Sequence, residues 1–496
     1  MRKELVINVT APESRAALLE DGRAVEVFHE RRGREGLVGN IYRGRVQRVL
    51  PGMQAAFVSL PDGSAERDAF LYVEDAIPRP VDLDFGESLD PGAPFEAERP
   101  RIDDLVKEGQ EIVVQVAKDP LAGKGPRVTA NISLPGRLLV YLPLVAEVGI
   151  SRRITDDVER ERLRQILESF RVEGGFIART AAQGASLEEF AHDCRYLTDL
   201  AARILSKAGE GGSPALIHRE LDLARRLARD VVTSDFAAIH VDEEAAHGRL
   251  SEFLAVVAPA LVSRLELHRG DDTIFERFGV EAEIERALKS RVELPSGSSI
   301  VIHQTEALVA IDVNTGKFVG KADLEETVFE TNREAVPEVA RQIRLRDLGG
   351  LLVVDFIDME DPEHRQEIFE RFEAELSRDR ARTRILQISA FGLIEVTRQR
   401  SRGNLEKTLT RPCPDCGGSG RVKTDLTVSL DLRRALLRAP PLYTAGEAVR
   451  VRVRPSLARF LAEEQPELLA DAESRLDVRI ELVPDETLPP AGYSIE

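Results

Sequence analysis

Two aspartates, each near the end of an apolar, strand-like segment, are the side chains best suited to do chemistry in this 496-residue chain. In ALVAIDVN (307–314), strand alternation puts Asp312 and Asn314 on one face and apolar residues on the other. In GGLLVVDFIDM (349–359), Asp355 interrupts an apolar run, so we expect its carboxylate to be buried. Ionised side chains in such strands are costly unless they are paired or bound to a metal ion. The pair therefore indicates a strand-end site for a hard cation held by oxygen ligands.

Magnesium suits such a site because it keeps several waters and commonly takes only one or two protein carboxylates. Its chemistry would be activation of water and neutralisation of charge on a phosphodiester. The alternative is that the aspartates only form turns or caps, which Asn314 on the same face as Asp312 makes less attractive. Asp358, in the run DMEDPE, is expected to face away from Asp355 if the strand continues and to belong to a turn or helix start.

A second candidate metal site is CPDCGGSG (413–420), which spaces Cys413 and Cys416 as in half of a zinc site and adds glycines for a tight loop. The third cysteine, Cys194 in AHDCRYL, is better explained as a small buried apolar residue. The same pair from a second chain would complete a four-cysteine site around a twofold axis, which predicts a homodimer. A pair without metal, or one completed by a histidine, is the alternative.

Arg179 and Thr180 follow a strand-like GGFIA and place a cation next to a hydroxyl. The guanidinium fork and a short hydroxyl donor suit a terminal phosphate. On these residues alone, an ordinary surface Arg-Thr pair is the competing explanation.

Several elements must position these groups. Residues 39–127 carry short β-patterned segments broken by Pro, Gly and Asp, as in a small antiparallel barrel. Exposed aromatic and basic side chains on such a barrel bind single strands by stacking and charge, and the candidates are Phe57, Phe70, Lys118 and Lys124. A phenylalanine in a strand is, alternatively, part of the core, and a lone loop lysine is only solvated.

Other segments are less specific. The stretch 78–105, rich in proline and acidic residues, is expected to be a long surface loop. Residues 225–290 are expected to be mostly helical, and a strongly periodic helix separates the two carboxylate strands.

Composition limits the class of protein. With 43% hydrophobic and 31% charged residues, the chain has the balance of a soluble globular protein of several domains. No apolar run approaches the roughly 20 residues of a membrane span, and no secretory signal precedes the first strand, so we expect a cytoplasmic protein. Three cysteines exclude a disulfide framework. A net charge of −18 argues against nonspecific nucleic-acid binding, so an enzyme acting on nucleic acid must concentrate its cations locally.

The two carboxylate strands carry a resemblance to a known family. QTEALVAIDVNTGKF, then LEETVFETNREAVPEVARQIRLRDLGGLLVVDFIDM, resembles in order and spacing the catalytic signature of the ribonuclease E/G family. The similarity runs from NIYRGRV near residue 40 to CPDCGGSG, with similar N-terminal strands, and covers about four-fifths of the chain. It implies an endoribonuclease that cleaves single-stranded, A/U-rich RNA to 5′-phosphate and 3′-hydroxyl ends, in ribosomal RNA maturation and messenger turnover.

The resemblance also implies roles for single residues. Asp312 and Asp355 would coordinate Mg²⁺, and Asn314 would support the scissile phosphate or the metal ligands. A sensor for a 5′-monophosphate would combine Arg179 and Thr180 with a loop and a cation further along the chain; these are Gly136 and Val140 in SLPGRLLV and Arg382 in DRAR. Zinc would be shared between protomers, and Phe57, Phe70, Lys118 and Lys124 would contact RNA.

The implied fold class is α+β and multidomain. An S1 (OB-fold) β-barrel and the 5′ sensor are inserted in a ribonuclease H-like subdomain; a deoxyribonuclease I-like catalytic subdomain, a zinc link and a small C-terminal domain follow. The expected bounds are 1–38 and 225–290 for the ribonuclease H-like parts, 39–127 for the S1 domain, 128–224 for the sensor region, 291–408 for the catalytic subdomain, 409–421 for the zinc link and 422–496 for the small domain.

Two other functions compete with the endoribonuclease. A noncatalytic RNA-binding scaffold would have no need of the carboxylates, and a phosphorolytic exoribonuclease would carry a repeated core that is not seen. Within the family, the absence of a long Arg- and Pro-rich extension that recruits degradosome partners favours the G type, although E-type chains without an extension exist. The sequence leaves open whether the chain forms a dimer or a dimer of dimers.

Overall fold

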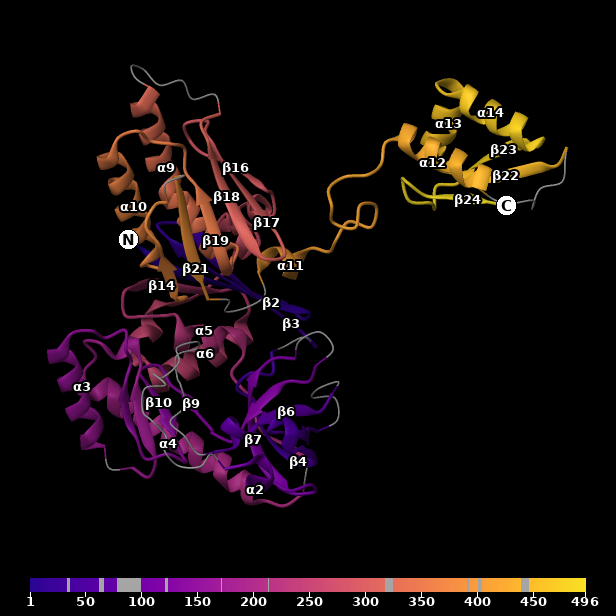
Figure 1. Cartoon of the computed structure of the whole chain (residues 1–496). Helices are drawn as coiled ribbons and strands as arrows, with labels where there is room; N and C mark the ends of the chain where they lie inside the picture. Colours follow the sequence, from indigo (N-terminus) through magenta and orange to yellow (C-terminus); the bar gives the residue numbers. More distant parts are fainter. Residues whose placement is uncertain are drawn as a thin grey trace. The chain divides into compact units, whose positions relative to one another are not determined.

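The computed structural model describes two compact units, Met1–Thr408 and Leu409–Glu496 (Figure 1). The described residues are 1–33, 36–61, 67–77, 100–120, 124–170, 172–212, 214–316, 324–389, 392–399, 404–438 and 446–496. Most of the expected surface loop, residues 78–99, lies outside them. No helix within these ranges is long and apolar enough to cross a membrane.

The first sheet of unit 1 joins the start of the chain to a segment more than 200 residues further on. Its order is β15-β14-β1-β2-β3, and β1 pairs with β14 in parallel. The strands are β1 (Lys3–Val9), β2 (Glu13–Glu20), β3 (Arg23–Arg31), β14 (Phe236–Val241) and β15 (Leu265–Leu267). Helices α5 (Leu223–Asp230) and α6 (Glu244–Val257) pack on it in one apolar core. The segment 225–290 is thus helical only in part, because two of its strands complete this sheet.

A closed barrel follows the first sheet. Its strands are β4 (Ile41–Leu50), β5 (Ala55–Ser59), β6 (Ala69–Tyr72), β7 (Glu111–Lys118) and β8 (Arg127–Thr129), in the order β4-β5-β6-β8-β7. Pairing of β4 with β7 closes the five strands around their own core, and β13 (Ala215–His218) is added to β4 outside the ring. Two short helices, α1 (Val73–Ala76) and α2 (Ile102–Leu105), accompany the barrel.

A small α/β layer comes next in unit 1. Its sheet has the order β11-β12-β10-β9 and is formed by β9 (Leu134–Pro135), β10 (Leu139–Leu142), β11 (Val148–Ile150) and β12 (Gly175–Ala178). Helices α3 (Asp157–Ser169) and α4 (Leu187–Gly209) bury apolar side chains in the same core as this sheet. Cys194, on α4, is buried in that core, as expected from the sequence.

The carboxylate strands belong to a six-stranded sheet with the order β16-β17-β18-β19-β21-β20. The strands are β16 (Arg291–Glu293), β17 (Ser299–Gln304), β18 (Leu308–Asn314), β19 (Gly350–Asp355), β20 (Thr383–Ile385) and β21 (Leu393–Arg398). Helices α9 (Leu324–Leu345) and α10 (Pro362–Leu376) share the apolar core on one face, and they lie to one side of the strands in Figure 1. Side chains on the other face are largely exposed.

Helix α9 also fastens this sheet to the first one. Arg344 is almost fully buried and pairs with Glu20 at 2.8 Å, and Arg341 donates to the backbone carbonyl of Ala24 at 2.7 Å. Buried, paired charges of this kind fix one relative placement because removing either partner leaves a costly orphan. The remaining short elements of unit 1 are α7 (Ile274–Arg277), α8 (Val280–Ala287) and the 3-10 turns Pro51–Met53, Thr180–Ala182 and Pro259–Arg264; α11 (Leu405–Leu409) ends at the boundary with unit 2.

Unit 2 contains a three-stranded sheet with helices on it. The strands β22 (Ala448–Val453), β23 (Arg479–Pro484) and β24 (Tyr493–Ile495) have the order β23-β22-β24. Helices α12 (Asp425–Arg438), α13 (Pro455–Glu463) and α14 (Pro466–Leu476) share its apolar core. The cysteine loop precedes α12.

Candidate functional site

The two predicted catalytic aspartates lie side by side. Strands β18 and β19 run in parallel, and their register pairs Asp312 directly with Asp355. Both side chains are exposed on the open face, whereas the intervening apolar residues of β18 point into the helix-covered core, as alternation predicted. The expectation that Asp355 is buried was wrong: it is the last residue of β19 and opens to solvent at the strand end.

Asn314 and Asp358 complete the polar surroundings. The Asn314 side-chain amide donates to Asp312 Oδ2 at 2.7 Å, which holds that carboxylate in one rotamer. Partial burial, the charge of Asp312 and the charge of Asp358 raise the pKa of Asp355 above its ordinary value. Because β19 ends at Asp355, Asp358 lies in the segment before α10, as the expected turn or helix-start residue.

Clustered negative charge of this kind fits a divalent cation. The charges of Asp312 and Asp358 raise the cost of ionising Asp355, and a bound cation would remove that repulsion. Two carboxylates with an amide-supported oxygen suit Mg²⁺, which needs few protein ligands. Among the described residues, no group of three or more His, Cys, Asp or Glu side chains is arranged to hold a metal ion.

The barrel carries one cross-strand row of aromatic and basic side chains. Register places Phe57 beside Phe70, with Arg48 beyond Phe57, and Arg127 then Lys118 beyond Phe70. This row crosses all five strands. Its side chains are exposed or half-buried, while the neighbouring apolar residues of the same strands fill the barrel core.

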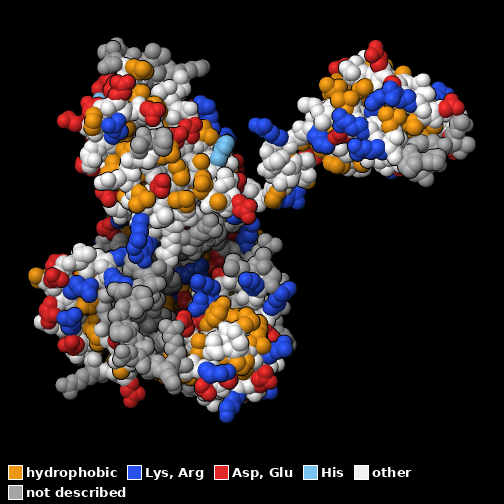
Figure 2. Space-filling view, in the orientation of Figure 1, with side chains coloured by type: hydrophobic (Ala, Val, Ile, Leu, Met, Phe, Trp, Pro, Cys, Tyr) orange, Lys and Arg blue, Asp and Glu red, His pale blue; other side chains and the backbone are white. Residues whose placement is uncertain are grey.

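The aromatic members of this row touch. The ring centroids of Phe57 and Phe70 are 5.4 Å apart and nearly perpendicular, and Tyr72 lies 4.3 Å beyond Phe70 with the Arg127 guanidinium 4.9 Å from its ring. In Figure 2 hydrophobic side chains gather around β6 with Lys and Arg at their margin. Phe57 and Phe70 are therefore not part of the barrel core. We call Arg48, Phe57, Phe70, Tyr72, Arg127 and Lys118 the barrel platform; Lys124 is exposed near β8.

Sequence reasoning missed three members of the platform, Arg48, Tyr72 and Arg127. The alternation in AFLY, which puts Phe70 and Tyr72 on one face, was a signal for the tyrosine. Nothing local pointed to the arginines, because each joins the row only through strand pairing.

In the predicted 5′-end sensor, Arg179 is held from one side. Its Nη1 donates to the carbonyl of Gly136 and to Asp230 Oδ1, the latter at 2.8 Å, while its backbone N–H donates to the carbonyl of Leu138. Asp230 also receives two hydrogen bonds from Arg229. Although burial alone would raise it, Arg229 and Arg179 hold the pKa of Asp230 well below its ordinary value. Arg179 is therefore a fixed cation.

The other sensor candidates lie on nearby elements. Thr180 is within 3.0 Å of the Ser151 hydroxyl, and Val140 is a buried residue of β10. Arg382 is exposed just before β20, and its turn is tied to the sensor region because Arg153 donates to the carbonyl of Arg380 at 3.0 Å. The structure thus brings Arg179 and the Gly136 loop into contact and brings the Arg382 turn to the same region.

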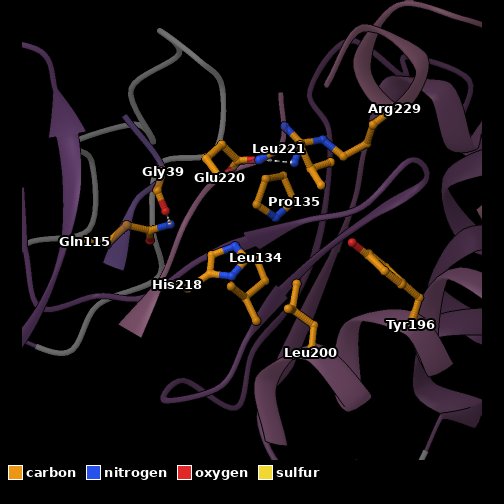
Figure 3. A pocket seen from close by; sticks show the side chains of 10 residues that line it. All are labelled: Gly39, Gln115, Leu134, Pro135, Tyr196, Leu200, His218, Glu220, Leu221 and Arg229. Carbon is orange, nitrogen blue, oxygen red and sulfur yellow. Dashed lines mark hydrogen bonds and ion pairs between the residues drawn. The ribbon is translucent and has the colours of Figure 1, made fainter. Parts of the chain in front are cut away.

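A small cavity of about 10 Å³ lies where the barrel, the sensor region and α5 meet (Figure 3). Glu220 pairs with the buried Arg229 at 2.8 Å on its wall, and the Gln115 side chain donates to Gly39. Burial lowers the pKa of His218, which also lines it. This volume holds about one water, so the cavity is a small gap between packed elements and is too small for a substrate.

The cysteine loop has the backbone of a thiolate site. Gly417 N–H donates to the Cys413 carbonyl at 2.8 Å, and Gly420 N–H points at Cys416 Sγ at 3.3 Å. Hydrogen bonds from Gly420 and Gly418 lower the pKa of the Cys416 thiol, which favours the thiolate that zinc requires. Gly418, with φ of 91°, supplies a turn that other residues rarely adopt. The pair fits half of a structural zinc site.

The chain combines a sheet that carries two paired aspartates with a closed barrel that carries an exposed row of aromatic and basic side chains. Residues 133–401 match the model of the ribonuclease E/G family, and residues 412–496 match that of its thioredoxin-like domain. The chain belongs to the ribonuclease E/G family. It is an endoribonuclease, a hydrolase acting on RNA.

Individual members of the family show which of its two types, ribonuclease G or ribonuclease E, the chain resembles more. The chain is 41% identical to ribonuclease G of Escherichia coli K12 over 95% of both chains. It is also 41% identical to ribonuclease G of Haemophilus influenzae, over 97% of this chain and 96% of that one. Identity to ribonuclease E of Escherichia coli K12 is 36% over 99% of this chain but 46% of that protein. The chain is thus ribonuclease G-like, and it spans about half the length of the ribonuclease E relatives.

Proposed function

We propose that the open face of the β16–β21 sheet is the active site of a Mg²⁺-dependent endoribonuclease that hydrolyses single-stranded RNA and leaves 5′-phosphate ends. The observation that carries this proposal is the register of Asp312 with Asp355, which sets two carboxylates on neighbouring strands on an exposed surface.

In this proposal Asp312 and Asp355 hold the ion, and Asn314 fixes the orientation of Asp312 through its amide. The ion, when bound, would supply activation of water and neutralisation of charge on the phosphodiester. The chain's own part is to hold the carboxylates in register and leave the face above them open to a strand of RNA. The subdomain of residues 291–408 would be the deoxyribonuclease I-like catalytic subdomain that the resemblance implies.

We further propose that the barrel platform binds the RNA by stacking bases on Phe57 and Phe70, with Lys118, Lys124 and Arg127 near the phosphates. The barrel would be an S1 (OB-fold) domain, residues 39–127, between the ribonuclease H-like parts, 1–38 and 225–290. The barrel platform would thus supply the local cations that a chain with a net charge of −18 needs in order to bind RNA.

The sensor region, residues 128–224, is proposed to bind a 5′-monophosphate and so stimulate cleavage. A fixed Arg179 beside the Gly136 loop supports this, since a held guanidinium is a good phosphate fork. Thr180, Val140 and Arg382 are the other proposed contacts. The substrates would be A/U-rich RNAs in ribosomal RNA processing and messenger turnover, in the cytoplasm.

Cys413 and Cys416, in a zinc link of residues 409–421, are proposed to bind one Zn²⁺ together with the same pair of a second copy. The small domain of residues 422–496 would follow. A homodimer, or a dimer of dimers, is the resulting assembly.

Cleavage of a 5′-monophosphorylated, A/U-rich RNA with Mg²⁺ tests the proposal, with wild type compared to Asp312→Asn and Asp355→Asn. We expect internal cuts with 5′-phosphate products in wild type, and a loss of roughly a thousandfold in each variant, since a catalytic metal supplies several kcal/mol. RNA binding should survive in both. Cleavage that persists in both variants refutes the site, and binding without any cleavage by wild type leaves the scaffold explanation.

A further inference from the structure

One fully buried carboxylate, that of Asp193, contacts the backbone of the sensor loop at Arg137–Leu139. Asp193, on α4, is 0% exposed, and it belongs to neither the proposed catalytic site nor the RNA-contacting set. It accepts hydrogen bonds from three successive backbone N–H groups, those of Arg137 at 3.1 Å, Leu138 at 2.8 Å and Leu139 at 2.8 Å. No local sequence signal predicts this contact, because α4 and the loop are more than 50 residues apart.

Three hydrogen bonds to one carboxylate are a strong constraint. Charge-assisted bonds are roughly twice as strong as neutral ones, and each of these N–H groups would be buried without a partner if the carboxylate were removed. Burial raises the pKa of Asp193, while the three N–H groups and the charge of Arg179 act in the other direction. The carboxylate thus accepts all three of these loop N–H groups and holds them toward α4.

The glycine of the sensor loop is explained by the same carboxylate. A Cβ at Gly136 would lie 2.5 Å from Asp193 Oδ2 and 2.6 Å from Oδ1, closer than side chains approach. Gly136 therefore makes room for Asp193. Its φ is not in the left-handed range, so close approach alone requires a glycine.

The loop in turn orients Arg179. The guanidinium donates to the carbonyl of Gly136, and the Arg179 backbone donates to the carbonyl of Leu138 at 2.8 Å. Asp193 holds the N–H groups of this loop, and Arg179 is bonded to its carbonyls. The orientation of the loop depends on Asp193, and the loop carbonyl of Gly136 together with Asp230 sets the direction of the guanidinium.

We propose that Asp193 is the positioning residue of the 5′-end sensor: it fixes the backbone of Arg137–Leu139, and through the Gly136 carbonyl it aims Arg179 at a 5′-monophosphate. This inference rests on the proposed sensor function. It assigns to Asp193 control of selectivity for the RNA 5′ end, without contact with RNA.

The test compares initial cleavage rates of the full chain on two RNAs of one sequence, one with a 5′-monophosphate and one with a 5′-hydroxyl. The variant is Asp193→Asn, which keeps the shape but turns N–H donors toward the loop. The matched control is Asp199→Asn, on the exposed side of the same helix. Thermal unfolding of each variant is recorded alongside.

We expect the wild-type rate ratio to exceed one and to fall by roughly tenfold, toward one, in Asp193→Asn, because a charge-assisted bond to a phosphate is worth about that factor. The 5′-hydroxyl RNA should be cut as by wild type, and Asp199→Asn should keep the wild-type ratio. An unchanged ratio in Asp193→Asn, or equal loss on both RNAs, overturns the inference. A wild-type ratio of one refutes the sensor itself, and the inference falls with it.

If Asp193→Asn does not fold, Gly136→Ala decides, since its methyl group meets the same carboxylate. A reduced ratio in that variant supports the positioning role. If the ratio of Gly136→Ala equals that of wild type, the positioning role is refuted, because a loop that tolerates the methyl group is not held against Asp193.

Discussion

Truncating Phe57 on the barrel platform gives the sharpest quantitative prediction. Phe57 is half-buried, contacts Phe70 edge to face at 5.4 Å, and lies in a row that continues to Arg127 and Lys118. If one base stacks on this ring, Phe57→Ala loses about 1–3 kcal/mol of binding. A central value of about 2 kcal/mol corresponds to roughly a thirtyfold rise in Kd.

Folding should survive the change. The aromatic contact with Phe70 is worth about 0.5–1.5 kcal/mol beyond its area, and the side chain lies outside the barrel core. Two controls separate stacking from apolar cover: Phe57→Tyr keeps a flat ring and should bind like wild type, while Phe57→Leu keeps apolar bulk and should bind like the alanine variant.

The assay is fluorescence anisotropy of a short single-stranded RNA in an Asp312→Asn background, so that the RNA stays intact. The salt dependence of binding gives a second readout. Arg127→Ala should reduce the steepness of the plot of log binding constant against log salt concentration by about 0.7, because one phosphate contact is lost. Phe57→Ala should leave this slope unchanged. Binding of Phe57→Ala within twofold of wild type, or wild-type binding by Phe57→Leu, would refute the stacking argument.

Four further outcomes are expected. Arg398→Met should destabilise unit 1 by about 3–5 kcal/mol in urea unfolding, because Asp379, whose side chain is 1% exposed, loses its 2.6 Å partner. Asp355→Asn should raise metal-free stability by about 0.5 kcal/mol through loss of like-charge repulsion and abolish stabilisation by Mg²⁺ in thermal shift. Cys413→Ser should lose bound zinc by elemental analysis and shift the assembly toward monomer on size exclusion. Because burial holds the pKa of His218 below 6.5, the unfolding free energy should fall as pH drops through 6.5, and less so in His218→Gln.

Each of these predictions has an opposing result. A stable Arg398→Met chain would mean that Asp379 finds another donor or water. Mg²⁺ stabilisation that persists in Asp355→Asn would place the cation elsewhere. A Cys413→Ser chain that keeps its zinc and assembly would remove the shared site, and identical pH profiles for wild type and His218→Gln would show that other groups set the acid limb.

The sequence predicts a feature well when that feature depends only on residues that are close together in the chain. Alternation in β18 is a local property, so Asp312 and Asn314 were assigned to one face correctly. The burial of Asp355 was misjudged because an apolar run does not reveal where the strand ends. Strand β14 was missed within 225–290 because FAAIHV is short and flanked by helices.

Other features exist only through tertiary pairing. The five barrel strands are separated by loops of different length, so no spacing in the sequence announces that Arg48 and Lys118 share a row with Phe57. The same holds for Asp193, which reads as an ordinary helical residue until α4 packs behind the Gly136 loop.

The pairing of β1 with β14 has a consequence for synthesis of the protein. Strand β14 begins at Phe236, long after β1 ends at Val9, so at ribosomal rates of about 5–20 residues per second the first strands wait roughly 10–45 s for their neighbour. During that interval the barrel and the α/β layer behind it emerge, while one edge of β1 stays unpaired. A nascent chain stalled before Val241 would present an open apolar strand edge, the kind of edge on which polypeptides aggregate.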